Sequence, residues 1–172
     1  MKKVFISMLV ASTLFAAKSF AQVSATANAG ADIVAPIAIL KTGDMNFGIV
    51  ARSNVNGWVQ LSAAGVRTTT GGALLLSQTG TVTPATFAVT GEAGYTYAIT
   101  LPTSVTLTNT TGAGGETMVV ENFVSTPTVA AGGVLVAGTQ TLSVGGELVI
   151  AGNQVSGNYL AGTPFTVTVN YN

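Results

Sequence analysis

The last nine residues, "PFTVTVNYN" at 164–172, alternate between large apolar and polar side chains. Phe165, Val167, Val169 and Tyr171 are separated by threonine or asparagine. Because successive side chains of a β-strand point to opposite faces, this pattern predicts a strand with one buried face that runs to the chain end. Chain ends fray unless they are paired, so this strand needs a partner in the same chain or in another one.

Similar short β-rich runs recur along the chain, about ten residues apart, with Gly, Asn, Asp or Pro between them. No stretch has a convincing helical period. The runs are 45–50, 57–62, 73–76, 85–90, 95–101, 104–108, 117–123, 133–138, 140–144, 147–152 and 164–171. This spacing predicts an all-β protein, an antiparallel sandwich or barrel in a single domain.

Alternation within the runs indicates which side chains are buried. The segment TGEAG (90–94) predicts a hairpin turn between two of the runs. The core candidates around this turn are Phe87, Val89, Tyr95, Tyr97, Ile99 and Leu101. Trp58 is the single tryptophan, and two interpretations stay open for it: a core or rim residue, or a platform on which a sugar stacks.

Residues 1–21 have the pattern of a secretory signal peptide, cleaved before Gln22. Two lysines are followed by the apolar run 4–17 and by the small residues Ser19 and Ala21. The apolar run is shorter than the roughly 20 residues that a membrane span needs. We therefore expect a secreted protein with no membrane span after signal cleavage.

The composition of the remaining chain excludes several classes of protein. Lys41, Arg52 and Arg67 are its only cations beside six carboxylates, so it has no basic stripe for nucleic acid. There is no cysteine and hence no disulfide framework. With 48% hydrophobic residues, the chain is also too apolar to be disordered. Stability must come from packing and from backbone pairing.

An unusually long alternating stretch follows the predicted cleavage site. Every odd position from Val23 to Ile39 is apolar, which is longer than an ordinary strand of about five or six residues. Pro36 divides the stretch because proline cannot donate to a β-ladder. We predict an extended arm over 22–32 and a β-domain over 33–172, whose first strand is 33–40. The arm pairs either with its own domain or with another chain.

No residue of the chain is a credible catalyst, metal ligand or cofactor ligand. Histidine and cysteine are absent, which removes the common nucleophile systems and the usual zinc sites. Glu116 and Glu121 lie an odd number of positions apart, on opposite faces of a regular strand. We therefore expect no enzyme activity and no cofactor.

Several segments resemble a family of small secreted bacterial proteins, some described as fimbrial major subunits. The carboxyl-terminal FTVTVNY, with its penultimate Tyr171, is similar to the last strand of chaperone–usher pilus subunits. The other similar segments are DMNFG (44–48), FAVTGEAGYTYAITLP (87–102), TQTLSVGGELVIAGNQ (139–154) and GNQVSGNYLAGTPFTVTVNY (152–171). The resemblance implies an immunoglobulin-like β-sandwich that lacks its final strand.

The resemblance also implies partners and roles. A periplasmic chaperone fills the groove first, an outer-membrane usher takes part in assembly, and the arm of a neighbouring copy then replaces the chaperone. The implied donor side chains are Val23, Ala25, Ala27, Ala29, Ala31 and Ile33. The residues implied to flank the groove and face the chaperone are Phe165, Val167, Val169 and Tyr171. The expected location is the periplasm and then the cell surface.

One alternative function stays open. A self-complete sandwich could act as a secreted adhesin or glycan-binding module. Exposure of Trp58, Tyr95 and Tyr97 would favour that function.

Overall fold

The computed structural model describes residues 22–111 and 115–172, and the chain divides into two compact units, Met1–Ile33 and Val34–Asn172. The described residues of the first unit, 22–33, form no strand and are all exposed. The predicted signal peptide, 1–21, lies outside the described residues.

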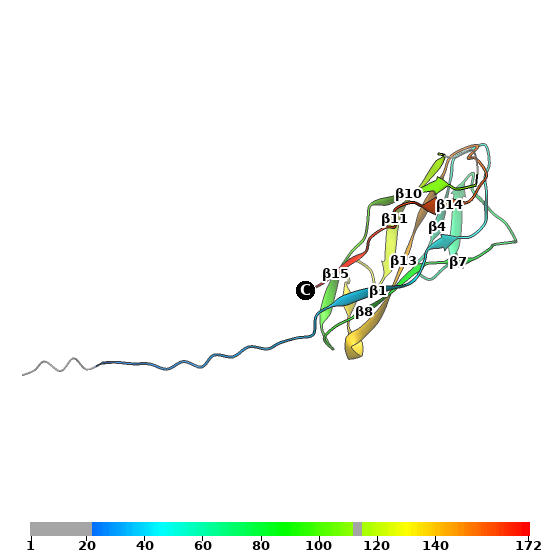
Figure 1. Ribbon diagram of the computed structural model, residues 1–172. Helices are drawn as coiled ribbons and strands as arrows, with labels where there is room; N and C mark the ends of the chain where they lie inside the picture. Colours follow the sequence, from blue (N-terminus) through cyan, green and yellow to red (C-terminus); the bar gives the residue numbers. More distant parts are fainter. Residues whose placement is uncertain (1–21, 112–114) are drawn as a thin grey trace, which may run out of the picture. The chain divides into compact units, whose positions relative to one another are not determined.

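The second unit is all-β, and its strand ladders are antiparallel (Figure 1). Its largest sheet has eight strands and curls strongly, like half a barrel. Six strands follow in the order β1 (Ala38–Gly43), β8 (Ala85–Thr90), β13 (Thr139–Ile150), β11 (Thr117–Thr126), β10 (Ser104–Asn109) and β14 (Tyr159–Ala161). The other two are β4 (Gly57–Leu61), which pairs with β13, and β5 (Arg67–Gly71), which pairs with β4.

Three smaller sheets complete the unit. One has three strands, in the order β12 (Gly133–Val134), β9 (Thr96–Thr100) and β15 (Thr168–Tyr171). The other two are pairs: β2 (Asn46–Phe47) with β7 (Val82–Thr83), and β3 (Val50–Ala51) with β6 (Leu74–Leu75). A short 3-10 turn, η1 (Val136–Gly138), follows β12, so the predicted strand over 133–138 is only partly present.

The carboxyl-terminal strand finds its partner within its own chain. β15 pairs with β9, with Val169 opposite Ile99 and Thr168 opposite Thr100. The strand begins at Thr168 rather than at residue 164 as predicted. Continuing the register would place Thr166 opposite Pro102, and proline has no N–H to donate to the ladder.

Two predicted strands, 140–144 and 147–152, are in fact one. β13 runs without a break through Gly145 and Gly146. A Cβ atom at Gly145 would lie 2.1 Å from the carbonyl oxygen of Leu61 on β4. The glycine therefore lets β4 approach β13 closely, and it does not end the strand.

The predicted hairpin at 90–94 is wrong. β8 already has β1 on one edge and β13 on the other, so β9 cannot pair with it and lies in the three-stranded sheet. The turn instead joins two sheets. Tyr95, predicted to be in the core, lies at the end of this turn with 44% of its surface exposed. Its ring packs edge-on against that of Tyr171, at a centroid distance of 5.6 Å.

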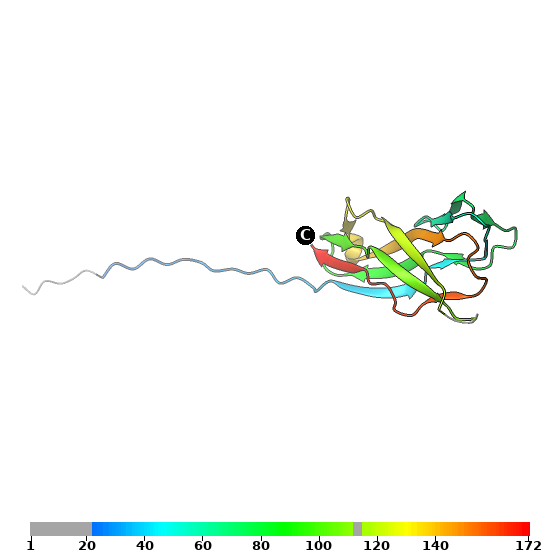
Figure 2. The ribbon, with the colours of Figure 1, turned by 90° about the horizontal axis from the view of Figure 1, so that it is seen from above.

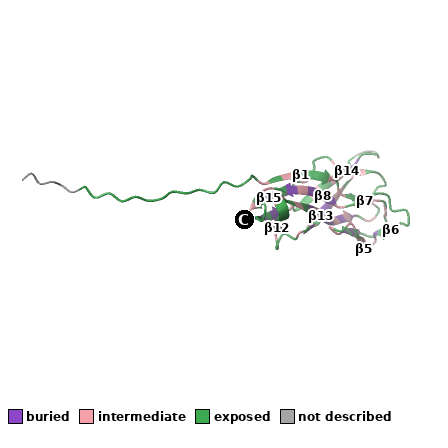
Figure 3. Ribbon diagram, turned by 90° about the horizontal axis from the view of Figure 1, so that it is seen from below, coloured by how far each residue is buried: buried purple, intermediate pink, exposed green. Residues whose placement is uncertain are grey.

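The buried residues lie along the strands of the second unit (Figure 3). Their side chains form two clusters. Cluster one is Ala85, Phe87, Val89, Tyr97, Ile99, Leu135, Leu142, Val144, Val167 and Val169, which joins β8 and β13 to the three-stranded sheet. Cluster two is Phe47, Val59, Leu61, Ala73, Val120, Leu148 and Ile150, on β4, β11 and β13 of the large sheet together with β2 and the residue before β6. Of the predicted core residues, Phe87, Val89, Tyr97 and Ile99 are confirmed as buried, and Leu101 is half-buried.

Tyr97 should make the folded state sensitive to alkaline pH. Burial raises the pKa of Tyr97 above the ordinary value of 10.0. As the pH rises, the Tyr97 phenol therefore loses its proton in the unfolded chain before it does so in the folded chain. The contribution of Tyr97 to the free energy of unfolding is fully present below about pH 10 and is lost as the pH rises further. The hydroxyl donates to Gln140 Oε1 at 2.8 Å.

A Tyr97→Phe variant tests this dependence. We expect it to lose about 1 kcal/mol at neutral pH and to fall less steeply in melting temperature between about pH 9 and about pH 11. Thermal unfolding followed by circular dichroism gives both values. The other tyrosines remain in the variant, so parallel slopes for the two proteins would contradict the assignment to Tyr97.

Candidate functional site

Two strand edges without a partner lie close together in the second unit (Figures 1 and 2). β1 is the last strand of the large sheet and β15 the last strand of the three-stranded sheet. No ladder joins them among the described residues. Ile37, Ile39 and Tyr171 all pack against cluster one, to which Val169 belongs. We call the line along which the free edges of β1 and β15 approach each other the seam.

The Tyr171 hydroxyl ties down one end of the seam. It accepts a hydrogen bond from Glu92 N at 2.6 Å and donates one to Ala35 O at 2.8 Å. Ala35 N in turn donates to Glu92 Oε2 at 2.9 Å. Both backbone groups of Ala35 are thus bound to side chains distant in sequence.

These bonds explain why the first strand does not begin at residue 33 as predicted. Ala35 uses its backbone groups outside any ladder, and Pro36 has no N–H. β1 therefore begins at Ala38. Ile33 belongs to the first unit and is 97% exposed.

Beyond the seam, a groove of about 1110 Å³ opens between two walls. One wall is made of residues 41–52, and the other of residues 154–161 with Pro164 and Phe165. Buried side chains of the core form part of the lining, and these are Phe47, Ala85, Phe87, Val120, Leu148 and Ile150. The floor of the groove is therefore formed by side chains of the core.

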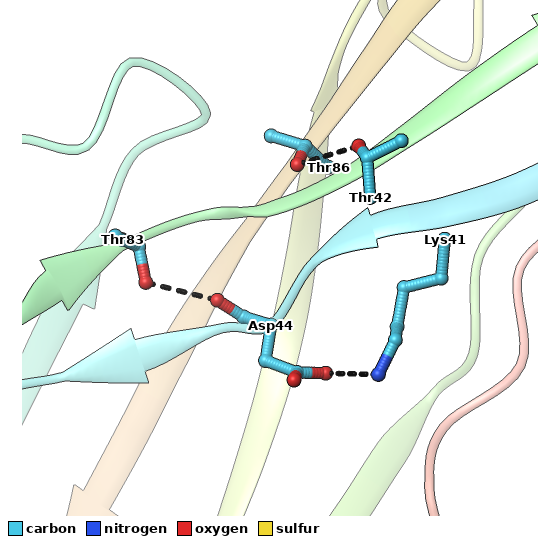
Figure 4. A network of polar contacts seen from close by, with 5 residues as sticks. All are labelled: Lys41, Thr42, Asp44, Thr83 and Thr86. Atoms are coloured by element: carbon cyan, nitrogen blue, oxygen red, sulfur yellow. Dashed lines mark hydrogen bonds and ion pairs between the residues drawn. The ribbon is translucent and has the colours of Figure 1, made fainter.

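A polar network stiffens the first wall where β1 passes into β2 (Figure 4). Lys41 Nζ contacts Asp44 Oδ1 at 2.6 Å, and Thr83 donates to the Asp44 carbonyl at 2.9 Å. Thr42 donates to Thr86 on β8 at 2.9 Å. The ion pair is exposed and contributes little by itself. Together, however, these contacts tie the wall to β7 and β8.

The second wall is held by its own contacts. Tyr159 donates to Val155 O at 2.7 Å and accepts from Gln154 Nε2 at 2.9 Å. The ring of Phe165 packs against Phe123 at a centroid distance of 5.1 Å. Each wall is thus supported independently of the other.

The structure places the predicted site residues as follows. Phe165 and Tyr171 are half-buried, while Val167 and Val169 are 8% exposed; all four pack with cluster one of their own chain. Phe165 also lines the groove. The predicted donor residues lie in the first unit, where all are exposed: Val23, Ala25, Ala27, Ala29, Ala31 and Ile33.

No pattern in the sequence predicts the groove. Its walls come from opposite ends of the domain, and its lining draws on buried residues such as Val120 and Leu148, which the alternation marks only as apolar. Near Ala35, only Pro36 had a predictive value, because a proline indicates a break in a strand. The hydrogen-bond partners of Ala35 could not be predicted from it.

The arrangement combines two features that are typical of sites for an extended polypeptide. A free strand edge offers unpaired backbone N–H and C=O groups, and a neighbouring apolar groove accepts alternate side chains. The described residues contain no group of three or more acidic, His or Cys side chains that could hold a metal ion. Within the same residues, no helix is long and apolar enough to cross a membrane.

Comparison with known proteins identifies one family. Residues 37–171 match the family described as "Domain of unknown function (DUF4402)". No curated protein matches the sequence, and no solved structure matches the fold. The matched region begins just before β1 and ends at the last residue of β15, so it includes both edges of the seam and the whole groove. The chain belongs to the DUF4402 family.

Proposed function

We propose that this protein is a secreted structural subunit of a bacterial pilus or fimbria that assembles by strand donation. In this proposal, residues 22–33 of one copy enter the seam and groove of the next. The domain acts as an immunoglobulin-like sandwich that lacks one strand. The observation that carries the proposal is the pair of unpaired edges, β1 and β15, next to a groove lined by core side chains.

The arm has the properties of a suitable occupant. It is exposed, it forms no strand of its own, and its apolar side chains alternate. Val23 and Ile33 are 93% and 97% exposed. Burying either one would contribute about 1.5–3 kcal/mol, and the alanines between them clearly less. Backbone hydrogen bonds, at about 1 kcal/mol each, would then supply much of the affinity.

The carboxyl-terminal segment has a second role in this proposal. A periplasmic chaperone would occupy the seam beside β15 until an outer-membrane usher brings the next subunit. Phe165, which packs against cluster one and lines the groove, would contact the chaperone. The finished polymer would lie on the cell surface.

Removing the arm tests the proposal. Chains 22–172 and 34–172 are purified and compared by size-exclusion chromatography, electron microscopy and unheated gel electrophoresis. We expect fibres or detergent-resistant ladders from the longer chain only, because only it carries a donor.

Adding the arm back separates donation from a general effect of truncation. A peptide of residues 22–35 should bind chain 34–172 and raise its melting temperature, whereas a peptide of the same composition in scrambled order should not. If both chains stay monomeric and the peptide does not bind, the proposal is wrong.

A further inference from the structure

The outer face of the large sheet carries the chain's single tryptophan. Burial alternates along β4: Gly57, Val59 and Leu61 point into the core, while Trp58 and Gln60 are exposed. Trp58 keeps 36% of its surface in solvent. The structure therefore favours a rim or platform position over a core position for this residue.

The indole ring leans against the neighbouring strand. A Cβ atom built on Gly71 of β5 would lie 3.1 Å from Cζ3 of Trp58. The absence of a side chain at Gly71, whose φ is +64°, therefore makes room for the ring. One edge of the indole therefore lies next to the backbone of β5, while part of the ring stays in solvent.

Polar groups surround the indole on the same face. In the ladders, Trp58 is opposite Thr70 on β5 and Val149 on β13. One row further, Gln60 is opposite Thr68 and Glu147. Directly opposite side chains have Cβ atoms about 4.5–5.5 Å apart, and diagonal neighbours are also within reach. The ladders therefore place residues with amide, hydroxyl and carboxylate groups on the face of the indole, at most one row away from it.

An irregularity in β11 adds a further polar group. The ladder between β11 and β13 shifts register between Glu121 and Val124, and Asn122 has a φ of 49°. Such bulges re-aim side chains and recur beside functional sites. Here the Asn122 amide donates to Glu147 Oε1 at 3.0 Å, which orients the carboxylate.

Charge on this face limits the kind of ligand. The strands β4, β5, β11 and β13 carry a single cation, Arg67. Its guanidinium donates to the carbonyl oxygens of Phe47 and Ile49 and is thereby engaged away from the indole. Glu121 and Glu147 are opposite each other in the ladder. An acidic ligand would meet carboxylates with no free cation to balance its charge.

We propose that the face centred on Trp58 binds a neutral saccharide. The apolar face of a pyranose ring would stack on the exposed indole, and its hydroxyl groups would bond to Gln60, Glu147 and Thr70. This combination of an aromatic platform with amide and carboxylate groups suits a sugar, because every sugar ring presents both C–H and O–H groups. The site is independent of the seam and groove, so it would remain in an assembled subunit.

Trp58 is also a built-in reporter, since the chain has no other tryptophan. Chain 22–172 is titrated with lactose, cellobiose and diacetylchitobiose, and with sialyllactose as the acidic comparison. We expect a saturable change in indole emission at millimolar concentrations of at least one neutral sugar, and a weaker effect when the sugar carries a carboxylate. No change with any neutral sugar at tens of millimolar would overturn the proposal.

Variants locate the binding on this face. By calorimetry, Trp58→Ala should weaken binding of the responding sugar about tenfold or more, and Trp58→Phe less. Tyr95→Ala is the matched control, because it removes an aromatic ring that is 44% exposed in the turn before β9, away from β4. Equal losses in Trp58→Ala and Tyr95→Ala would contradict the proposal. So would an emission shift that follows protein concentration without sugar, because it would indicate packing between copies.

Discussion

Disulfide-linked dimers are expected when a chain carrying Ala29→Cys is mixed with a chain carrying Ala161→Cys under oxidising conditions. The natural chain has no cysteine, so each variant offers one thiol. Ala29 lies on the apolar face of the arm, and Ala161 is half-buried in the groove wall on β14. If the arm of one copy enters the groove of another, the two thiols come within disulfide distance, with Cα atoms about 4.4–6.8 Å apart.

The arm position closest to Ala161 depends on the register, so Ala25, Ala27 and Ala31 are tested in the same way. One of the four should cross-link nearly completely, and its neighbours much less. This pattern would also define the register of the donor.

Two matched controls make the result specific. Asn28→Cys places the thiol on the opposite face of the arm, and Thr68→Cys places the acceptor on the exposed outer face of β5. Neither should cross-link efficiently. A chain that carries both Ala29→Cys and Ala161→Cys gives a further outcome. If it closes a disulfide within itself at high dilution, the arm folds back on its own domain and strand donation between subunits is contradicted.

Val169→Asp is expected to abolish the folded state. Val169 is 8% exposed in cluster one, on a strand whose ladder partner is β9 alone. An unpaired carboxylate there costs several kcal/mol, on top of the lost apolar contacts. Since domains of this size are stable by only about 5–15 kcal/mol, the variant should be unfolded or close to it at room temperature.

The adjacent residue provides the control. Asn170→Asp introduces the same charge one position later, on the exposed face of the same strand. It should change stability by no more than about 0.5 kcal/mol. Circular dichroism melting curves of the two variants measure the difference. A cooperative transition for Val169→Asp near that of the natural chain would mean that β15 does not contribute to the core.

Much of the strand content could be read from the sequence because side-chain alternation is a local property. The inward positions of 165–171 were predicted correctly, and so was the burial of Val89, Tyr97 and Ile99. Predictions that depended on pairing did less well. The turn at 90–94 looked like a hairpin, and nothing in its residues shows that both edges of β8 are already occupied.

The two parts of the candidate site, the arm on one hand and the seam with the groove on the other, differ in how far the sequence predicts them. Apolar side chains occupy every second position of the arm without interruption, so its apolar face can be read directly from the sequence. The seam and groove do not, because they exist only where distant segments meet. Ala35 and Tyr171, for example, are 136 positions apart, yet one hydrogen bond joins them at the end of the seam.

The sequence alone thus determines an all-β chain, the buried face of several strands and the alternation of the arm, since these depend on a period of two residues. Folding in three dimensions decides which strands become neighbours. β1 and β15 each keep one unpaired edge, and the Tyr171 hydroxyl, Ala35 and Glu92 bind one another at the end of the seam, although these residues are far apart in sequence. The groove is open because the walls on either side are each supported by their own contacts, and no local pattern of side chains encodes that space.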